Sequence, residues 1–131
     1  MFESYEIQDA RLMICRLKGI LDARSAERVV EFIEIKEVEI ENGFHRFCDM
    51  TLLEGIQLSF MELLGVAERR AVFNPNDIHV KSAFFAIHPV AFGIASMYQH
   101  FLTSPRIELR VFEDLEAAAE WLAVSPDILK L

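Results

Sequence analysis

The sequence lacks most of the signals that identify an enzyme or a metal protein. Its 131 residues include only two cysteines, and no CxxC pair or His/Cys cluster has the spacing of a metal site. Neither a glycine-rich phosphate loop nor a nucleophile elbow is present. These absences predict that the protein uses no metal or cofactor and is not an enzyme.

Positive charge is scarce as well. The chain carries 13 Lys and Arg against 21 Asp and Glu, which gives a formal net charge of −8. Because a chain of this charge repels phosphate backbones, we expect no nucleic-acid partner.

An uninterrupted long apolar run is also missing. The longest apolar region, residues 82–102, is divided by a His-Pro pair at 88–89 and by polar residues at 99 and 100. The residue before a proline disfavours helix, so the region splits into a strand and a helix and predicts no transmembrane segment. The first ten residues, MFESYEIQDA, show no cationic segment of a secretory signal, so we expect a cytoplasmic protein.

Both cysteines, Cys15 and Cys48, lie inside apolar runs that read as strands. In a chain without an export signal a disulfide is not expected. We therefore predict two buried thiols that pack as small core residues.

The composition does provide a core. The chain is 53% hydrophobic and 26% charged, with eleven Phe and one Trp as bulky filling. This is typical of one globular domain, and we expect that domain to span residues 1–131.

Hydrophobic periodicity predicts a helix or a strand for most of the chain. Residues 11–18 are apolar on both faces, as in a central strand, and the alternating segment 2–8 precedes them as the other arm of a hairpin. Three further strands are predicted over residues 44–50, 78–87 and 106–112.

Helix signals fall between these strands. Asp22 or Ser25 caps a helix to about residue 41, Ser59 opens a second, Pro89 a third that runs to about 102, and Asp114 a fourth. The alternation predicts an α/β fold with a mixed, mainly parallel sheet of about five strands, an N-terminal hairpin and about four helices.

Two stretches resemble a known family. GILDARSAERVVEFIE, from Gly19, is similar to the opening of STAS domains, which are named for sulfate transporters and anti-sigma-factor antagonists. Asp49-Met50 fits the place where their next strand ends in an Asp- or Asn-Leu pair. RVFEDLEAAAEWL resembles the end of small bacterial single-domain proteins of the SpoIIAA-like or STAS/SEC14-like family. The resemblance spans nearly the full chain and implies the SpoIIAA-like fold, which lipid-carrying Sec14 domains share.

Anti-sigma-factor antagonists carry a phosphorylatable turn, Asp-Ser-(Ser or Thr)-Gly, at the start of their second helix. Spacing from Asp49 aligns that turn with Gln57-Leu58-Ser59-Phe60. Only Ser59 matches, and Leu58 stands where the resemblance places the phosphate acceptor. We interpret Ser59 chiefly as a helix cap in a capping box with Glu62, and keep a phosphorylation or binding role as the alternative.

Polar residues near predicted strand ends are candidates for a site. Asp49 and Thr51 follow a predicted parallel strand at the edge where open α/β sheets bind ligands. Asp49 either lines such a site or accepts hydrogen bonds from its own loop. His88 either bonds its loop or lies in a pocket beside Asp49, and acid–base chemistry by that pair is a remote alternative.

The helix over residues 89–102 is apolar on more than one face, which exceeds what a surface helix needs. We predict that this surface, with Phe92, Met97, Tyr98 and Phe101, meets either a second copy of the chain or an apolar ligand, and favour a homodimer over a lipid.

Two functions fit this pattern. The first is a non-catalytic regulatory or protein-interaction domain that resembles anti-sigma-factor antagonists without their phosphorylatable turn. It would form a homodimer or bind a regulatory protein partner. The alternative is a Sec14-like binder of a lipid or another apolar small molecule. A cavity beneath the helix over residues 89–102 is the feature that would distinguish the second function from the first.

Overall fold

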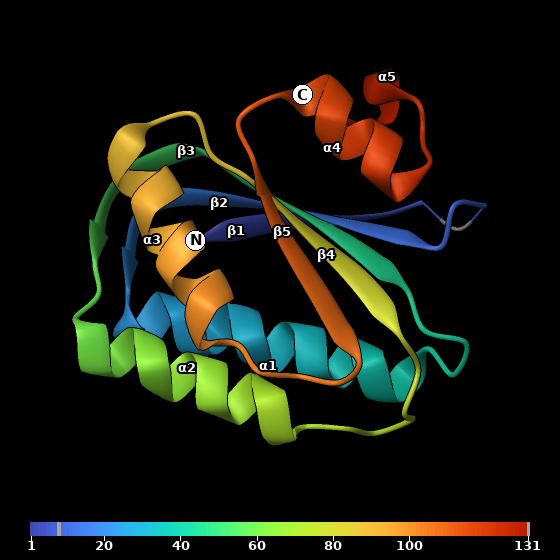
Figure 1. The fold of residues 1–131 in the computed structure, drawn as a ribbon, viewed down its shortest axis with the longest axis horizontal. Helices are drawn as coiled ribbons and strands as arrows, with labels where there is room; N and C mark the ends of the chain where they lie inside the picture. Colours follow the sequence, from blue (N-terminus) through green and yellow to red (C-terminus); the bar gives the residue numbers. More distant parts are fainter. Residues whose placement is uncertain (8, 131) are drawn as a thin grey trace.

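A five-stranded sheet in the order β1-β2-β3-β4-β5 organises the fold, as seen in a computed structural model that describes residues 1–7 and 9–130. β1 pairs with β2 antiparallel, and the other neighbours are parallel (Figure 1). The strands are β1 Phe2–Ile7, β2 Leu12–Asp22, β3 His45–Gln57, β4 Val80–Phe85 and β5 Ile107–Phe112. The predicted mixed sheet with an N-terminal hairpin is confirmed.

Helices cover both faces of this sheet. One face carries α1 Ala23–Glu39, α2 Phe60–Val72 and α3 Pro89–Phe101, and the other carries α4 Leu115–Leu122 and the short α5 Pro126–Leu129. The α/β fold class is therefore as predicted. Within the described ranges, no helix combines the length and apolar character needed to cross a bilayer.

Two apolar layers follow from the period-two alternation of the central strands. The layer under α1–α3 includes Cys15, Leu17, Cys48, Met50, Ala91 and Ala95. The layer under α4 and α5 includes Leu12, Ile14, Phe47, Ala83, Ala118 and Leu129. Consecutive residues of β2 and β3 thus point to opposite faces of the sheet. Two candidate site residues can therefore come together only if they lie on the same face.

Side chains at the helix starts satisfy free backbone N–H groups, as predicted. Ser59 Oγ accepts from the Glu62 N–H at 3.1 Å, and Glu62 Oε1 accepts from the Ser59 N–H at 2.8 Å, which completes the capping box. Asp22 caps α1 in the same reciprocal way with Ser25, and Asp114 caps α4.

Two predicted strand ends were wrong. β2 continues past residue 18 to Asp22, with Gly19 at φ +72° inside the strand, and β3 continues past residue 50 to Gln57. Register shifts on both sides of residues 18–19 keep the two long strands paired. α1 ends at its C-cap Ile40, and Gly43 adopts a left-handed conformation in the turn that follows.

Removing the Ser59 cap should reduce stability without changing the fold. We expect Ser59→Ala to lower the free energy of unfolding by about 1 kcal/mol, because the Glu62 N–H loses its acceptor. Ser59→Asp keeps an acceptor and should lose much less. Urea denaturation followed by the fluorescence of Trp121 measures both, and equal losses for the two variants would contradict the cap.

Candidate functional site

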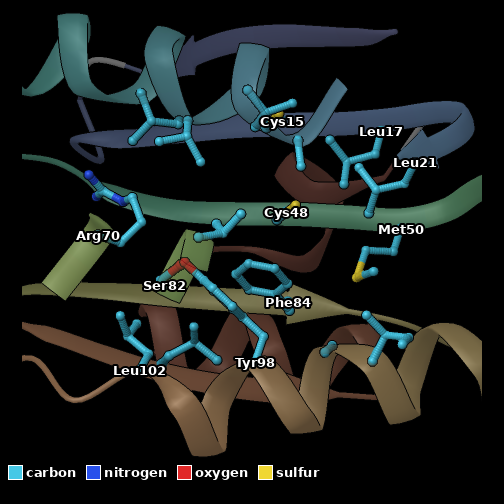
Figure 2. Close-up of a pocket in the computed structure, with 18 of the residues that line it drawn as sticks. Cys15, Leu17, Leu21, Cys48, Met50, Arg70, Ser82, Phe84, Tyr98 and Leu102 are labelled. Carbon is cyan, nitrogen blue, oxygen red and sulfur yellow. The ribbon is translucent and has the colours of Figure 1, made fainter. Parts of the chain in front are cut away.

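An apolar cavity of about 140 Å³ lies between the sheet and helices α1, α2 and α3. Figure 2 shows its wall, with Cys15, Leu17 and Leu21 from β2, Cys48 and Met50 from β3, and Tyr98 and Leu102 from the α3 side. It is partly open to solvent. A cavity beneath residues 89–102 is the feature that distinguishes a binder of apolar ligands from an interaction domain.

Small side chains at the centre of the layer leave this space. Cys15, Cys48 and Ser82 lie on three adjacent strands, and Ala95 faces them from α3. Bulkier residues such as Met50 and Phe84 surround them. Because close-packed cores contain few voids larger than a water molecule, an apolar space of this size is a specific feature of the chain.

One end of the cavity is polar and positively charged. Its wall there includes Arg46, Arg70, Ser82 and Tyr98, and Figure 2 shows Arg70 and Ser82 at the end opposite Leu21 and Met50. Arg46 and Arg70 are buried, with exposed fractions of 6% and 4%. A buried charge needs a partner, so the groups that surround these arginines decide the chemistry of this end.

The principal partner is Glu37 of α1, which is 3% exposed. It accepts two hydrogen bonds from Arg70, at 2.8 and 2.9 Å, one from Arg106 at 3.1 Å and one from Arg46. Glu34 adds a second carboxylate beside Arg70. Burial alone would raise the pKa of Glu37, but the hydrogen bond from Arg70 and the charges of Arg46 and Arg70 lower it to about 2.

Arg46 is less well satisfied than Arg70. Its Nε is a buried donor with no acceptor among residues 1–7 and 9–130. Burial lowers the pKa of Arg46 to about 10, and the nearby charges of Arg70 and Arg106 act in the same direction against the attraction of Glu37. Its guanidinium stacks on Phe44, with the carbon centre 4.7 Å from the ring centroid. The Arg46 guanidinium is thus held in place by Phe44 and Glu37, and its positive charge is only partly compensated.

Tyr98 extends from α3 into the cavity towards Ser82 (Figure 2). Burial raises its pKa to about 12, so its hydroxyl keeps its proton at neutral pH. No hydrogen bond within the described part of the chain contributes to that pKa. The hydroxyl is therefore available to a ligand.

Asp49 lies in the middle of β3, on the other face of the sheet. It is 2% exposed, pairs with Arg16 at 2.8 Å, and accepts from the backbone N–H and hydroxyl of Thr51 at 2.8 and 2.6 Å. Arg16 also donates to the carbonyls of Leu129 and Lys130. One alternative had Asp49 accept hydrogen bonds from its own loop; it does accept from the nearby Thr51 N–H, but Thr51 lies within β3. The main partner of Asp49, Arg16, had no signal in the sequence.

His88 and Ser59 are exposed positions outside the cavity. His88 precedes α3, where its Nδ1 accepts from the Val90 N–H at 3.3 Å, so the bond is to a backbone N–H rather than to a loop carbonyl. Ser59 caps α2. Because the Asp49 carboxylate is committed to Arg16 and Thr51 under α4 and α5, the structure does not bring Asp49 and His88 together as a pair.

The candidate residues of α3 separate into different environments. Tyr98 enters the cavity, Phe101 packs edge-on against Phe60 with ring centroids 4.9 Å apart, and Phe92 packs against the apolar layer. Met97 is 37% exposed. The sheet, the cavity and α2 therefore account for most of the apolar surplus of this helix.

The arginine–glutamate cluster was missed by sequence reasoning. Glu34 and Glu37 share the buried face of α1 with Ala26 and Val30, and Arg46 stands inside an apolar strand. The available signal was the presence of charged residues at positions where the pattern predicts burial. Because charged side chains are rarely buried unless they are paired, such positions indicate a buried ion pair. The same cluster draws Arg70 inward, so α2 buries Leu63, Ala67 and Arg70.

Both cysteines are buried and free, as predicted. Cys15 and Cys48 face each other in register on β2 and β3 and both line the cavity. A hydrogen bond between them lowers the pKa of Cys15 and, together with burial, raises that of Cys48. Since the chain has no other cysteine, any thiol signal comes from the cavity wall.

Two solved structures share this architecture. An uncharacterized protein of the DUF3478 family with a SpoIIAA-like fold, from Shewanella loihica PV-4, matches with a TM-score of 0.57 and 17% identity, over 93% of this chain and 92% of that chain. The anti-sigma factor antagonist SpoIIAA in its unphosphorylated form matches with a TM-score of 0.50 and 15% identity, over 94% and 98%. No protein-family model and no curated protein matches the sequence. The chain has the SpoIIAA-like fold that its motifs implied.

Glu37 should dominate the acid stability of the protein. Its pKa falls from 4.5 to about 2 on folding, so its contribution is complete above about pH 4.5 and is lost as the pH falls towards 2. The shift corresponds to roughly 3 kcal/mol. We expect Glu37→Gln to cost roughly 3–5 kcal/mol at neutral pH, because it leaves buried arginines uncompensated.

The exposed Glu39→Gln on the same helix is the matched control. Urea denaturation between pH 2 and 7 should show a steep loss of stability on acidification for the parent and for Glu39→Gln, and a shallower one for Glu37→Gln. Identical pH profiles for all three proteins would contradict the role of Glu37.

Proposed function

We propose that the protein is a non-catalytic, cytoplasmic binding domain that holds an apolar small molecule, or the tail of one, between the sheet and α3. The observation that carries this proposal is the cavity of about 140 Å³ lined by Cys15, Leu17, Met50 and their neighbours. It supports the second of the two functions that the sequence suggested.

Size and lining define the class of ligand. An apolar protein cavity of about 150 Å³ stays dry and takes up molecules of the size of benzene. Pockets for drug-sized ligands are larger, on the order of 300–1,000 Å³. A small ring or a slender alkyl chain therefore fits here better than a full diacyl lipid, and the opening to solvent provides a way in.

Protein contact is a second candidate function. Four apolar side chains at the starts of α2 and α3 are strongly exposed: Phe60 57%, Met61 69%, Ile87 59% and Val90 57%. The fold of an anti-sigma factor antagonist supports a regulatory partner, and a homodimer is the simplest alternative. A ligand beneath α3 and a partner on the exposed ends of α2 and α3 are compatible in one regulatory domain.

Uptake of an uncharged alkyl probe tests the first function. We expect 1-octanol to raise the melting temperature and to slow the reaction of Cys15 and Cys48 with a small uncharged thiol reagent, because the alkyl chain occupies the space beside both sulfur atoms. Native mass spectrometry of the purified protein would also detect a ligand that it retains.

Two variants of α3 make this test specific. Ala95→Leu fills the cavity and should abolish both effects of octanol, whereas Gly93→Ala, on the exposed side of the same helix, should preserve them. If octanol has no effect on the parent, or protects Ala95→Leu equally, the proposal fails.

Sedimentation velocity tests the second function. At micromolar concentration we expect a dimer that Val90→Glu dissociates, because the substitution places a charge on the exposed apolar end of α3. The exposed Gln99→Glu of the same helix is the control. A parent protein that sediments as a strict monomer would remove the homodimer and leave only contact with another protein.

A further inference from the structure

The geometry points to a carboxylate-binding site at the polar end of the cavity, formed by Arg46, Tyr98 and Ser82, so that the ligand is an acid with a short alkyl tail. This inference rests on the proposed function, since the tail would occupy the same apolar space. It adds the identity of the head group and the residues that recognise it.

The charge balance of this end favours an anion. Three buried guanidinium groups, those of Arg46, Arg70 and Arg106, surround the buried carboxylates of Glu34 and Glu37. Among these buried groups one positive charge remains without a counterpart, and the partly exposed Arg69 also pairs with Glu34, at 2.7 Å. A single carboxylate would complete the balance, whereas an ammonium group would meet three arginines.

The unused polar groups at this end are donors. Arg46 donates a hydrogen bond to Glu37 through Nη2, and its Nε has no acceptor among the residues that the structure describes. The Tyr98 hydroxyl keeps its proton and points into the cavity, with the Ser82 hydroxyl on the facing strand. A carboxylate accepts from guanidinium and hydroxyl groups, and a planar guanidinium matches its two oxygens.

Arg46 is the arginine with capacity left for a ligand. Arg70 donates through both of its terminal nitrogens to Glu37, and Arg106 is shared between Glu37 and the carbonyl of Phe73. The site therefore offers one partly free guanidinium and a few hydroxyl donors. That matches a monocarboxylate better than a phosphate dianion, which would bring two charges to one partly free arginine.

The tail has a defined direction. From the polar end, the cavity runs past Cys15 and Cys48 towards Leu21 and Met50 (Figure 2). An alkyl chain anchored at Arg46 would therefore lie across the two cysteines. Because head and tail contact different residues, their contributions can be measured separately.

Three eight-carbon probes test the head group: octanoate, 1-octanol and octylammonium. We expect the parent protein to bind octanoate at least tenfold more tightly than octanol, because the anion adds charge-assisted hydrogen bonds, and octylammonium more weakly than octanol. Protection of Cys15 and Cys48 from the uncharged thiol reagent, titrated with each probe, gives the three affinities.

Two variants assign the preference to residues. Tyr98→Phe removes one hydroxyl that forms no hydrogen bond with another described residue, and should reduce the octanoate preference several-fold while octanol binding stays unchanged. Arg46→Met should abolish the preference. Glu37 keeps Arg70 and Arg106 in that variant, and if it does not fold, Tyr98→Phe alone decides the test.

The outcomes separate the two proposals. Equal binding of octanoate and octanol would overturn the carboxylate site, with water as the partner of these donors, and leave the apolar site standing. A preference that survives unchanged in Tyr98→Phe would likewise overturn the assignment. If neither probe binds, both proposals fail.

Discussion

The carboxylate of Glu37 is the contact on which the rest of this face depends. It joins α1 to Arg46 of β3, Arg70 of α2 and Arg106 at the start of β5, so one buried group fixes two helices against two strands. Taking four charges out of water is costly, and an apolar cluster of the same volume would hold these elements together at least as well. Unlike an apolar cluster, the buried arginines and glutamates also give the apolar cavity a charged wall that is rich in hydrogen-bond donors. The same residues thus define the position of α1 and α2 and the chemistry of the cavity.

Local signals were enough to predict the fold. The caps at Asp22, Ser59 and Asp114 predicted where helices begin, and the apolar character of β2 predicted an interior strand, because each depends on a few neighbouring residues. The ends of β2 and β3 were not predictable in this way. Both strands continue beyond the expected ends because they pair with each other across a pair of bulges, and pairing partners are not encoded locally.

The site could be predicted only in part. Tyr98 was among the residues named on α3 and does line the cavity, but the apolar excess of that helix had been assigned first to a homodimer. Asp49 does not line the cavity, because the extended β3 places its side chain on the opposite face, against Arg16. The cavity exists because small side chains from different strands and helices, such as Cys15, Cys48 and Ala95, happen to face one another. These residues are far apart in the sequence, so no short motif predicts the cavity.

The contact between Arg16 and the end of the chain has a consequence for biosynthesis. Arg16 donates to the carbonyls of Leu129 and Lys130, which are 113 and 114 residues away in sequence. On a ribosome that adds about 5–20 residues per second, the arginine waits several seconds or more for these acceptors. Until then Arg16 of β2 has Asp49 as its ionic partner, on a sheet face that α4 and α5 have not yet covered. The nascent sheet is therefore exposed on this side for longest, and it is here that a chaperone would have most to protect.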